Sequence, residues 1–281
     1  HVNCYVLPDD RGATIVDPGM PGKSTMTALQ ARLDSIGIPL RRVHTVIVTH
    51  AHPDHYGGAG WVRQESGADI VTHQLFHTII DRHDPPDLDV EDAAALVVDG
   101  EHHSRDSWWK PPPWGGKHPM PLSRRLLVAA ARRFPRFAKT PTPTRRITDG
   151  TTMQLAGRDW FVMHTPGHTD DHVCFYDPTE GVLLSGDHVL PTITPHIGGW
   201  VRNADPLQSF FESLTKVAAL GDQVHTVLPA HGHPFDDLAG RAASIAEHHR
   251  GRLAVAAEAI AGEGSATVGA VSHHLFSERA Q

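Results

Sequence analysis

The sequence is poor in cysteine and contains no long apolar run. Cys4 and Cys174 are its two cysteines. Both lie in apolar, strand-like segments, so we expect two buried free thiols rather than the disulfide framework of a small secreted protein. No apolar stretch approaches the roughly 20 residues that cross a bilayer, and no signal peptide is recognisable. These absences predict a cytoplasmic protein without a membrane partner.

Negative charge is also scarce, but only in one region. The whole chain has a net charge of −7, whereas residues 101–150 contain eleven lysines and arginines against three acidic residues. A segregation of this size can steer an anionic partner to one face of a protein. Residues 101–148 also concentrate proline and tryptophan, which predicts an irregular insert of the kind that serves as a lid or a tether.

Two interpretations of this insert stay open. Its aromatic and basic residues either form a satellite core and a solvated face, or they contact a substrate. In the second case, the residues predicted to bind substrate are Trp108, Trp109, Trp114, Arg124 and Arg125.

Outside the insert, strand and helix patterns alternate along the chain. Short β-branched or apolar runs predict strands at 2–7, 13–17, 43–49, 69–72, 145–148, 152–155, 160–164, 172–176, 182–185 and 224–228. Helical spacing of apolar residues predicts helices at 23–36, 58–65, 74–82, 89–98, 123–134, 206–220 and 237–261. This alternation predicts an α/β protein.

The densest chemistry of the sequence lies where the strand 43–49 ends. Residues 49–55 read Thr-His-Ala-His-Pro-Asp-His, which places three imidazoles and a carboxylate within six residues. Imidazole nitrogen is the commonest metal ligand in proteins, and a carboxylate adds a hard oxygen donor. The run therefore predicts a metal site at the rim of a sheet.

Three more polar residues, His168, Asp187 and His231, follow other predicted strands. Side chains at strand ends along one sheet edge can converge, so we expect two sets of donors with zinc-like geometry. The first set is His50, His52 and His168; the second is Asp54, His55 and His231, with Asp187 as a bridge between them. Two cations about 3.5–4 Å apart lower the pKa of a shared water and polarise the bond under attack.

Four motifs in the same order carry a resemblance to a known family. They are THAHPDH at 49–55, TPGHT at 165–169, SGDH at 185–188 and PAHG at 229–232, and they follow Asp17-Pro18-Gly19, which is similar to an Asp-x-Gly loop. Over residues 1 to about 235 the chain resembles the metallo-β-lactamase superfamily. The resemblance implies a four-layer αββα sandwich with a helical C-terminal extension, and a dimetal site at the sheet edges.

The same resemblance implies a division of the chain. Residues 1–236 correspond to the catalytic domain, and residues 237–281 look like an incomplete winged-helix appendage of the β-lactamase-like-2 group. Asp17 and His188 are expected beside the metal ligands, where they would support the site without binding the metal.

Two features narrow the branch of the superfamily. His52 stands where the flavodiiron branch has a carboxylate, which disfavours redox iron chemistry, and no cysteine lies near Asp187, where the β-lactamase branch uses one. The His/Asp donor set is similar to glyoxalase II and its thioesterase relatives. It implies a dizinc hydrolase, with iron or manganese as alternative metals, in which a metal-bridging hydroxide oriented by the catalytic residue Asp54 cleaves a small anionic thioester or ester.

Other functions stay open from the sequence. The same centre could serve a metal-dependent ribonuclease or phosphodiesterase, whose basic insert binds RNA, or a lactonase. An iron-dependent persulfide oxygenase shares the first motif but uses one metal, and a non-catalytic binding module conflicts with the complete ligand set. The pattern leaves the oligomeric state open as well.

Overall fold

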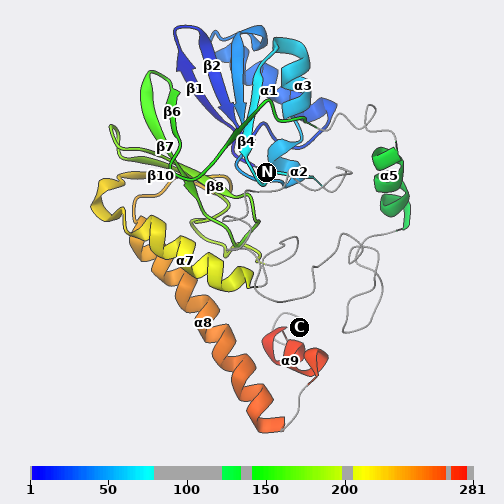
Figure 1. The fold of residues 1–281 in the computed structure, drawn as a ribbon, viewed down its shortest axis with the longest axis vertical. Coiled ribbons are helices and arrows are strands. Elements are labelled where there is room, and N and C mark those ends of the chain that lie inside the picture. The colour runs from blue at the N-terminus through cyan, green and yellow to red at the C-terminus, as the bar shows by residue number, and fades with distance from the viewer. Residues whose placement is uncertain (1, 79–121, 134–140, 198–204, 264–266, 277–281) are drawn as a thin grey trace.

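Two five-stranded sheets lie face to face in the computed structural model, which describes residues 2–78, 122–133, 141–197, 205–263 and 267–276 (Figure 1). The first sheet has the order β1-β2-β3-β4-β5. Its strands are Tyr5–Asp9, Gly12–Val16, Val43–Ile47, Asp69–His73 and Arg145–Ile147. β1 and β2 form an antiparallel hairpin, and β2 to β5 run parallel. The carboxyl ends of these four parallel strands therefore share one edge.

The second sheet has the order β10-β9-β8-β7-β6. Its strands in chain order are Thr152–Leu155, Arg158–His164, Val173–Asp177, Val182–Gly186 and Thr226–Pro229. β7 and β9 are each antiparallel to β8, while β9 and β10 are parallel. Consequently β7, β9 and β10 all point the same way. The Val173 N–H donates to the Thr49 carbonyl over 3.0 Å, which joins the ends of the two sheets on that side.

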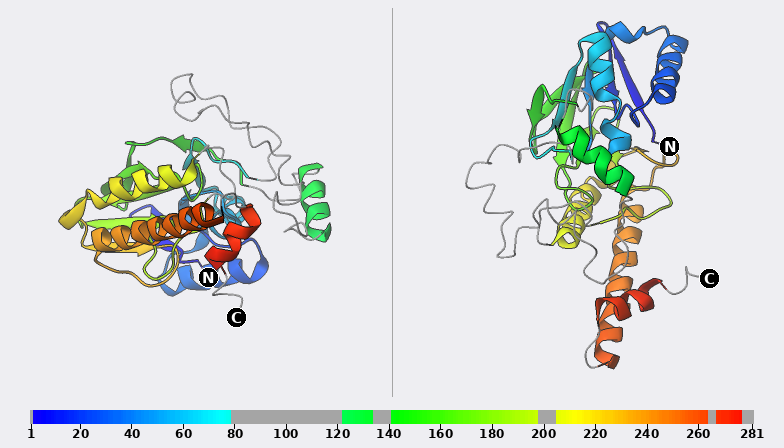
Figure 2. Two further views of the ribbon diagram at one scale, coloured as in Figure 1. Left: turned by 90° about the horizontal axis from the view of Figure 1, so that it is seen from below. Right: turned by 90° about the vertical axis from the view of Figure 1, so that its right-hand side faces the viewer.

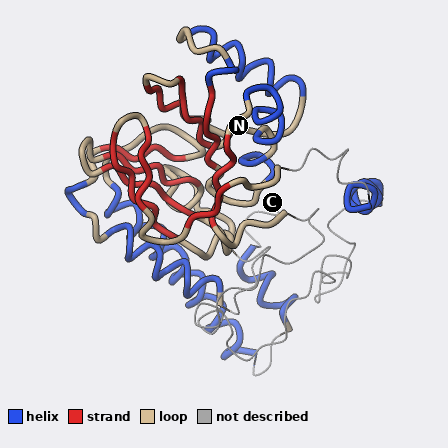
Figure 3. The backbone as a smooth tube through the Cα atoms, turned by 45° about the horizontal axis from the view of Figure 1, so that its top comes forward, coloured by secondary structure: helices blue, strands red, loops and turns tan. Residues whose placement is uncertain are grey.

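Helices cover the outer face of each sheet, and the strands occupy the middle of the molecule (Figure 3). On the first sheet, α1 (Lys23–Ser35) and α3 (Ala59–Ser66) bury apolar residues such as Leu33 and Val62. On the second, α7 (Pro206–Ala218) and α8 (Leu238–Glu263) form a core with β8 and β9. The fold is the predicted four-layer αββα sandwich.

A third apolar cluster fills the space between the sheets. Trp160, Phe175, Ile47 and Val71 belong to it, and each is at most 1% exposed. Burying a large side chain of this kind contributes on the order of 1.5–3 kcal/mol, so this layer fixes how the two sheets face each other. The remaining elements are η1 (Leu40–Arg42), α2 (Pro53–Tyr56), α5 (Leu122–Arg133), η3 (Gly221–Gln223) and α9 (Val268–Phe276).

Helix α8 has two unlike halves. Leu238, Ala242 and Ile245 in its first half are buried in the core of the second sheet. Its second half runs away from the sheets with α9 beside it (Figures 1 and 2), and Leu253 and Ile260 there are about half exposed. The division at residue 236 remains a prediction. No helix in the described part of the chain combines the length and apolar composition needed to cross a membrane.

The helix predicted at 74–82 is wrong over its described residues, 74–78, which form a turn followed by irregular backbone. One Arg146 nitrogen, Nη1, donates to the carbonyls of Gln74 at 2.7 Å and Phe76 at 3.0 Å, and Phe76 is buried in the core. Tertiary hydrogen bonds from β5 therefore replace the local ones that a helix would have used. The helix predicted at 89–98 lies outside the described residues.

His73 and His164 stack where the two sheets meet, with ring centroids 4.1 Å apart and an interplanar angle of 15°. Burial, followed by the neighbouring His164, Arg146 and Lys216, lowers the pKa of His73 to about 2. A histidine in an unfolded chain titrates near 6.5. Below about pH 6.5 His73 therefore binds a proton in the unfolded chain but stays neutral in the folded protein.

We expect the free energy of unfolding to fall as the pH drops below 6.5, by up to about 1.4 kcal/mol per pH unit from His73. His73→Asn removes the titration yet keeps an acceptor for the Leu75 N–H, which His73 Nδ1 accepts at 3.3 Å. Denaturant unfolding of metal-free protein between pH 5 and 7 measures both slopes. The free energy of unfolding of the wild type will depend on pH more steeply than that of the variant, by the equivalent of up to one proton. Equal slopes would contradict the lowered pKa of His73.

Candidate metal centre

The predicted donor residues meet at one edge of the sandwich. They follow β3, β7, β9 and β10, the strands whose carboxyl ends the sheet topology brings to the same side. The structure gathers them into two groups in which the donor atoms lie within 4.8 Å of one another: His50, His52, His168 and Asp187 in the first, and Asp54, His55 and His231 in the second. All seven residues singled out in the sequence thus lie in one of these two groups.

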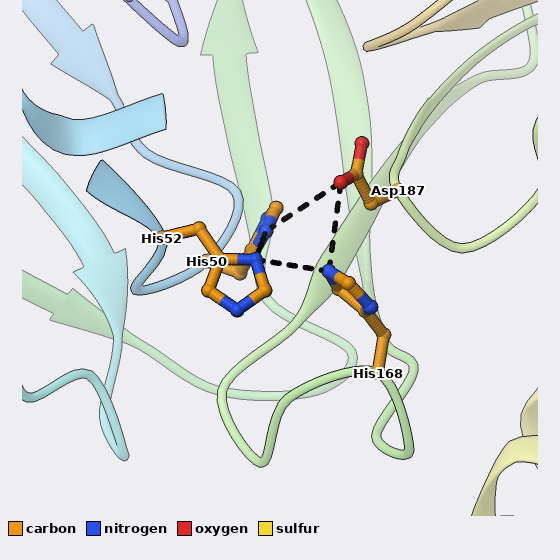
Figure 4. A group of neighbouring side chains, drawn as sticks. All are labelled: His50, His52, His168 and Asp187. Atoms are coloured by element: carbon orange, nitrogen blue, oxygen red, sulfur yellow. Dashed lines mark hydrogen bonds and ion pairs between the residues drawn. The ribbon is translucent and has the colours of Figure 1, made fainter. Parts of the chain in front are cut away.

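In the first group, four donor atoms point at one another (Figure 4). His52 Nδ1 lies 2.9 Å from His50 Nε2 and 3.1 Å from His168 Nε2. Asp187 Oδ2 lies 3.5 Å from His168 Nε2 and 3.9 Å from His50 Nε2. His50 is fully buried and His168 is 6% exposed, so this group forms the inner end of the site.

The second group is more open to solvent. His231 Nε2 lies 3.5 Å from Asp54 Oδ2, and His55 Nε2 lies 3.7 Å from the same oxygen. The Asp187 carboxylate faces this group too, with Oδ1 3.4 Å from His231 Nε2 and Oδ2 3.5 Å from His55 Nε2. The side chains of Asp54 and His231 are 35% and 23% exposed, which marks the side from which a substrate can enter.

These distances suit divalent cations. Donor atoms around a tetrahedral zinc ion with bonds of about 2.0–2.2 Å lie about 3.3–3.6 Å apart, and the separations in both groups cluster around that value. His55 Nε2 and Asp187 Oδ1 are buried and make no hydrogen bond. Buried polar atoms normally have partners, so these two atoms fit a role as metal ligands.

Hydrogen bonds on the far side of three imidazoles leave the inward nitrogen free to coordinate. His55 Nδ1–H donates to Asp17 Oδ2 over 2.9 Å, and His168 Nδ1–H donates to the His196 carbonyl over 2.6 Å. His50 Nδ1 lies 3.0 Å from Thr49 Oγ1. Each bond engages Nδ1 and leaves Nε2 as the nitrogen that can coordinate a cation, the usual support of a metal-binding histidine.

Asp17 connects three parts of the site. Its Oδ1 accepts the Thr49 N–H at 2.9 Å, and its Oδ2 accepts the Thr49 hydroxyl at 2.8 Å as well as His55 Nδ1–H. The backbone of Asp17 has φ 53°, a left-handed conformation that aspartate and asparagine tolerate better than most residues. Asp17 thus lies beside the donor residues and contacts one of them, His55, directly.

Burial and charge act in opposite directions on the pKa values of the centre. Burial lowers the pKa of His52 to about 4. Burial also lowers that of His55, but the carboxylates of Asp17 and Asp187 outweigh it and raise the pKa of His55 to about 10. Burial raises the pKa of Asp187, yet the surrounding imidazoles of His168, His231 and His55 hold it far below its usual range. The Asp187 carboxylate therefore stays charged in the middle of the site and attracts positive charge.

Sequence reasoning missed His172, which it read as the start of a strand. His172 is fully buried. Its Nε2 accepts the Asp187 N–H at 3.0 Å, and its Nδ1 lies 2.8 Å from Thr165 Oγ1. The Nδ1–H therefore donates to the threonine, and a neutral imidazole anchors the backbone of Asp187. His172 lies in the loop between β7 and β8, four residues after His168, and no local sequence pattern marks its role.

Gly186 is required for this anchor, so we expect Gly186→Ala to disrupt the centre. Gly186 has φ +51°, and a Cβ there would lie 2.5 Å from His172 Nε2. The variant must displace either His172 or Asp187, and a metal-binding support lost in this way costs about 10- to 100-fold in affinity. Zinc titration of the metal-free variant measures the loss.

Gly157→Ala is the matched control for Gly186→Ala. Gly157 has φ +74°, but nothing lies within 4 Å of a Cβ at that position. It carries the same backbone strain without the clash, so it will lower the melting temperature and leave zinc affinity unchanged. Equal affinities in the two variants would contradict the proposed role of the Gly186–His172 contact.

The loop after Asp187 depends on helix α8. Arg241 on α8 donates Nε to the Leu190 carbonyl over 2.6 Å and Nη2 to the Ile193 carbonyl over 2.9 Å. This loop leads to His196, whose carbonyl orients His168. The first turns of α8 therefore support the site from outside the motifs.

The other predicted site residues lie elsewhere. His188 is fully buried behind the donors, with its ring centroid 5.0 Å from that of Phe210, and burial lowers its pKa to about 3. Trp108, Trp109 and Trp114 lie outside the described residues, and Arg124 and Arg125 are described only as backbone of α5. Both cysteines are free thiols, and neither belongs to a donor group of the described chain.

Comparison with known proteins agrees with the fold. The Metallo-beta-lactamase superfamily profile matches residues 1–231. The probable metallo-hydrolase YqjP of Bacillus subtilis is 24% identical over 83% of this chain and 68% of its own length. A metallo-beta-lactamase family protein from Thermus thermophilus has a solved structure with a TM-score of 0.69 and 28% identity, over 98% of this chain and 82% of that one. TTHA1623, solved in a di-iron-bound form, has a TM-score of 0.52 and 24% identity over 86% of this chain and 93% of its own.

Fold, donor groups and comparisons together define a metal-dependent hydrolase. The chain belongs to the metallo-β-lactamase superfamily.

Proposed function

We propose that this protein is a dinuclear zinc hydrolase that cleaves a thioester or ester, as in glyoxalase II-like enzymes. One observation carries the proposal: the second donor group consists of Asp54, His55 and His231, with Asp187 facing both groups and no cysteine among them. Nitrogen and oxygen donors of this kind suit zinc, with iron or manganese as alternatives.

Two cations bound in these groups would supply Lewis acidity and a hydroxide nucleophile near neutral pH. The chain itself provides the rest. Hydrogen bonds to Thr49 and to the His196 carbonyl hold two of the imidazoles of the first group, so a carbonyl oxygen bound there would be oriented without a rearrangement of the site. Asp187 lies between the two groups and would contact the cation in each of them.

Asp54 is the residue we assign to orienting the attacking water. Its Oδ2 faces His55 and His231, and its side chain is 35% exposed, so water can reach this carboxylate. A charged carboxylate at that position aligns the lone pair of the water toward a substrate and can take up its proton.

The remaining parts of this proposal concern the surroundings of the site. Two free thiols fit a reducing, cytoplasmic location. The basic insert at 101–148 would hold the anionic part of the substrate, while residues 237–281 would form an extension to the catalytic domain 1–236.

A substrate panel tests the proposal. Purified zinc-loaded protein should hydrolyse at least one of a set of glutathione and coenzyme A thioesters, aryl esters and short-chain lactones. Activity confined to lactones would reassign it as a lactonase, and RNA cleavage with binding that weakens steeply as salt rises would reassign it as a ribonuclease. Turnover of persulfide with oxygen uptake, at one iron per chain, would overturn the dinuclear hydrolase.

A further inference from the structure

The loop that carries His231 is held from the opposite end of the chain. Asn3 Nδ2 donates two hydrogen bonds, to the Pro229 carbonyl at 2.9 Å and to the Gly232 carbonyl at 2.8 Å. The Asn3 backbone N–H donates to the Ala230 carbonyl at 2.7 Å. One residue therefore binds three carbonyls that surround His231.

Tyr5 adds a fourth bond to the same loop. Its hydroxyl donates to the Pro229 carbonyl over 2.7 Å. That carbonyl therefore accepts two hydrogen bonds, one from Tyr5 and one from the Asn3 side chain. Tyr5 opens β1, an edge strand of the first sheet, whereas Pro229 ends β10, an edge strand of the second. These contacts tie an edge strand of one sheet to an edge strand of the other.

The ladder of β10 cannot hold His231 by itself. β10 has one neighbouring strand in its sheet, β9, and their register shifts between Leu228 and Pro229. On its other side β10 has a bridge from Val227 to Phe235, which lies before the shift. Beyond the shift, the Ala230 N–H still donates to the Gly186 carbonyl at 2.9 Å, but Pro229 has no N–H to offer. The loop therefore leaves the sheet just before the ligand, and its conformation depends on other partners.

We propose that Asn3, assisted by Tyr5, is a positioning residue that sets the place of His231 in the second metal group. A primary amide donates two N–H bonds from one rigid plane, which is what two carbonyls on either side of a ligand require. The inference rests on the proposed dinuclear centre, because it takes His231 as a ligand.

The effect will be selective for one group. His231 belongs to the group of Asp54 and His55, whereas the first group draws no donor from the loop 229–232. Asp187 also keeps its own anchor in His172. Loss of the Asn3 bonds should therefore weaken the second cation and leave the first in place.

Stepwise Zn²⁺ titration of the metal-free full chain against a chromophoric chelator tests this. Asn3→Asp is isosteric but offers carboxylate oxygens to carbonyls in place of N–H donors. We expect the dissociation constant of the more weakly bound Zn²⁺ to rise by about 10- to 100-fold, the usual cost of losing a partner that orients a ligand. The dissociation constant of the more tightly bound Zn²⁺ should change by less than about threefold. Asn3→Ser keeps one side-chain donor, so its dissociation constant for the more weakly bound Zn²⁺ will lie between those of Asn3→Asp and the wild type.

The control is Arg42→Gln, at the far end of β1. Arg42 donates to the carbonyls of Arg11 at 3.1 Å and Asp10 at 2.7 Å. These are also side-chain hydrogen bonds to two backbone carbonyls, but none of the three residues belongs to a donor group. It will lower the melting temperature and change neither Zn²⁺ constant. If Asn3→Asp fails to fold, Tyr5→Phe removes a single hydroxyl and should still raise the weaker constant several-fold.

The outcomes separate the two proposals. If the wild type binds fewer than two Zn²⁺, the dinuclear centre itself is wrong. If the wild type binds two and the variants at Asn3 and Tyr5 keep its constants, the centre stands and the positioning role is overturned. The positioning role would also be overturned if the variants at Asn3 and Tyr5 bound both Zn²⁺ ions more weakly to the same extent and lost as much stability as Arg42→Gln.

Discussion

An Asp187→Asn variant will lose metal from both groups, and its hydrolytic activity will fall by more than about 100-fold. Residues that merely support a ligand typically cost about 10- to 100-fold when replaced. The loss of a ligand that serves both groups exceeds that. Elemental analysis after dialysis, together with initial rates on the substrate identified by the panel, measures the effect.

The reason is the place of the carboxylate among the imidazoles. Asp187 lies within 3.9 Å of four histidine nitrogens, two in each group: His50, His168, His55 and His231. It is 7% exposed, so water screens little of its charge. Asparagine keeps the shape of the side chain and removes the negative charge that compensates cations there.

Asp177→Asn is the control for this variant. Asp177 is fully buried, and its Oδ2 pairs with Arg158 Nε at 2.6 Å at the opposite end of β8. Breaking a buried pair on one side is destabilising, so Asp177→Asn will unfold at lower temperature and still bind its metals. Normal metal content in Asp187→Asn would contradict a shared carboxylate.

The second large effect is expected for Asp17→Asn. Asparagine tolerates the left-handed backbone at this position, but its amide cannot accept bonds from both His55 Nδ1–H and the Thr49 hydroxyl on a single anionic oxygen. His55 then loses the support that orients its Nε2. We expect the affinity for the second cation to fall by about 10- to 100-fold, measured by Zn²⁺ titration, with a smaller effect on the first.

A second Asp–His pair in the same sheet provides the control. Asp9 Oδ2 lies 3.0 Å from His44 Nε2, at the amino-terminal end of β3 and away from the donor groups. Asp9→Asn removes the same type of contact, so it will leave both cation affinities unchanged. Equal losses in Asp17→Asn and Asp9→Asn would mean that the Asp17 effect is only a loss of stability.

Much of this site could be predicted from sequence because of how it is built. Each donor stands directly after an apolar strand, and parallel strands deliver their carboxyl ends to one edge. The short run from His50 to His55, together with His168, Asp187 and His231, was therefore enough to assign two groups of donors. That these residues bind metal remains a prediction.

The supporting residues could not be predicted in the same way. Asn3 meets the loop of His231 across more than 220 positions of sequence, and its own neighbours carry no sign of that role. His172 resembles any histidine at the start of a strand until the Asp187 N–H is found beside it. Such partners depend on the packing of the two sheets, which no local pattern encodes.

The error at residues 74–78 has a related cause. The segment has helical spacing, but the guanidinium of Arg146 binds its carbonyls from a strand about 70 residues further along. Local propensity is weak beside tertiary hydrogen bonds and burial. The same holds for α8, whose periodic pattern predicts a helix but not that its first turns hold the loop that orients His168.

Anomalous diffraction at the zinc edge, from crystals of the zinc-loaded full chain, tests the central claim most directly. The account predicts two peaks about 3.5–4 Å apart, one among His50, His52 and His168 and one among Asp54, His55 and His231, with Asp187 between them. A single peak, or two peaks away from these seven side chains, would contradict it.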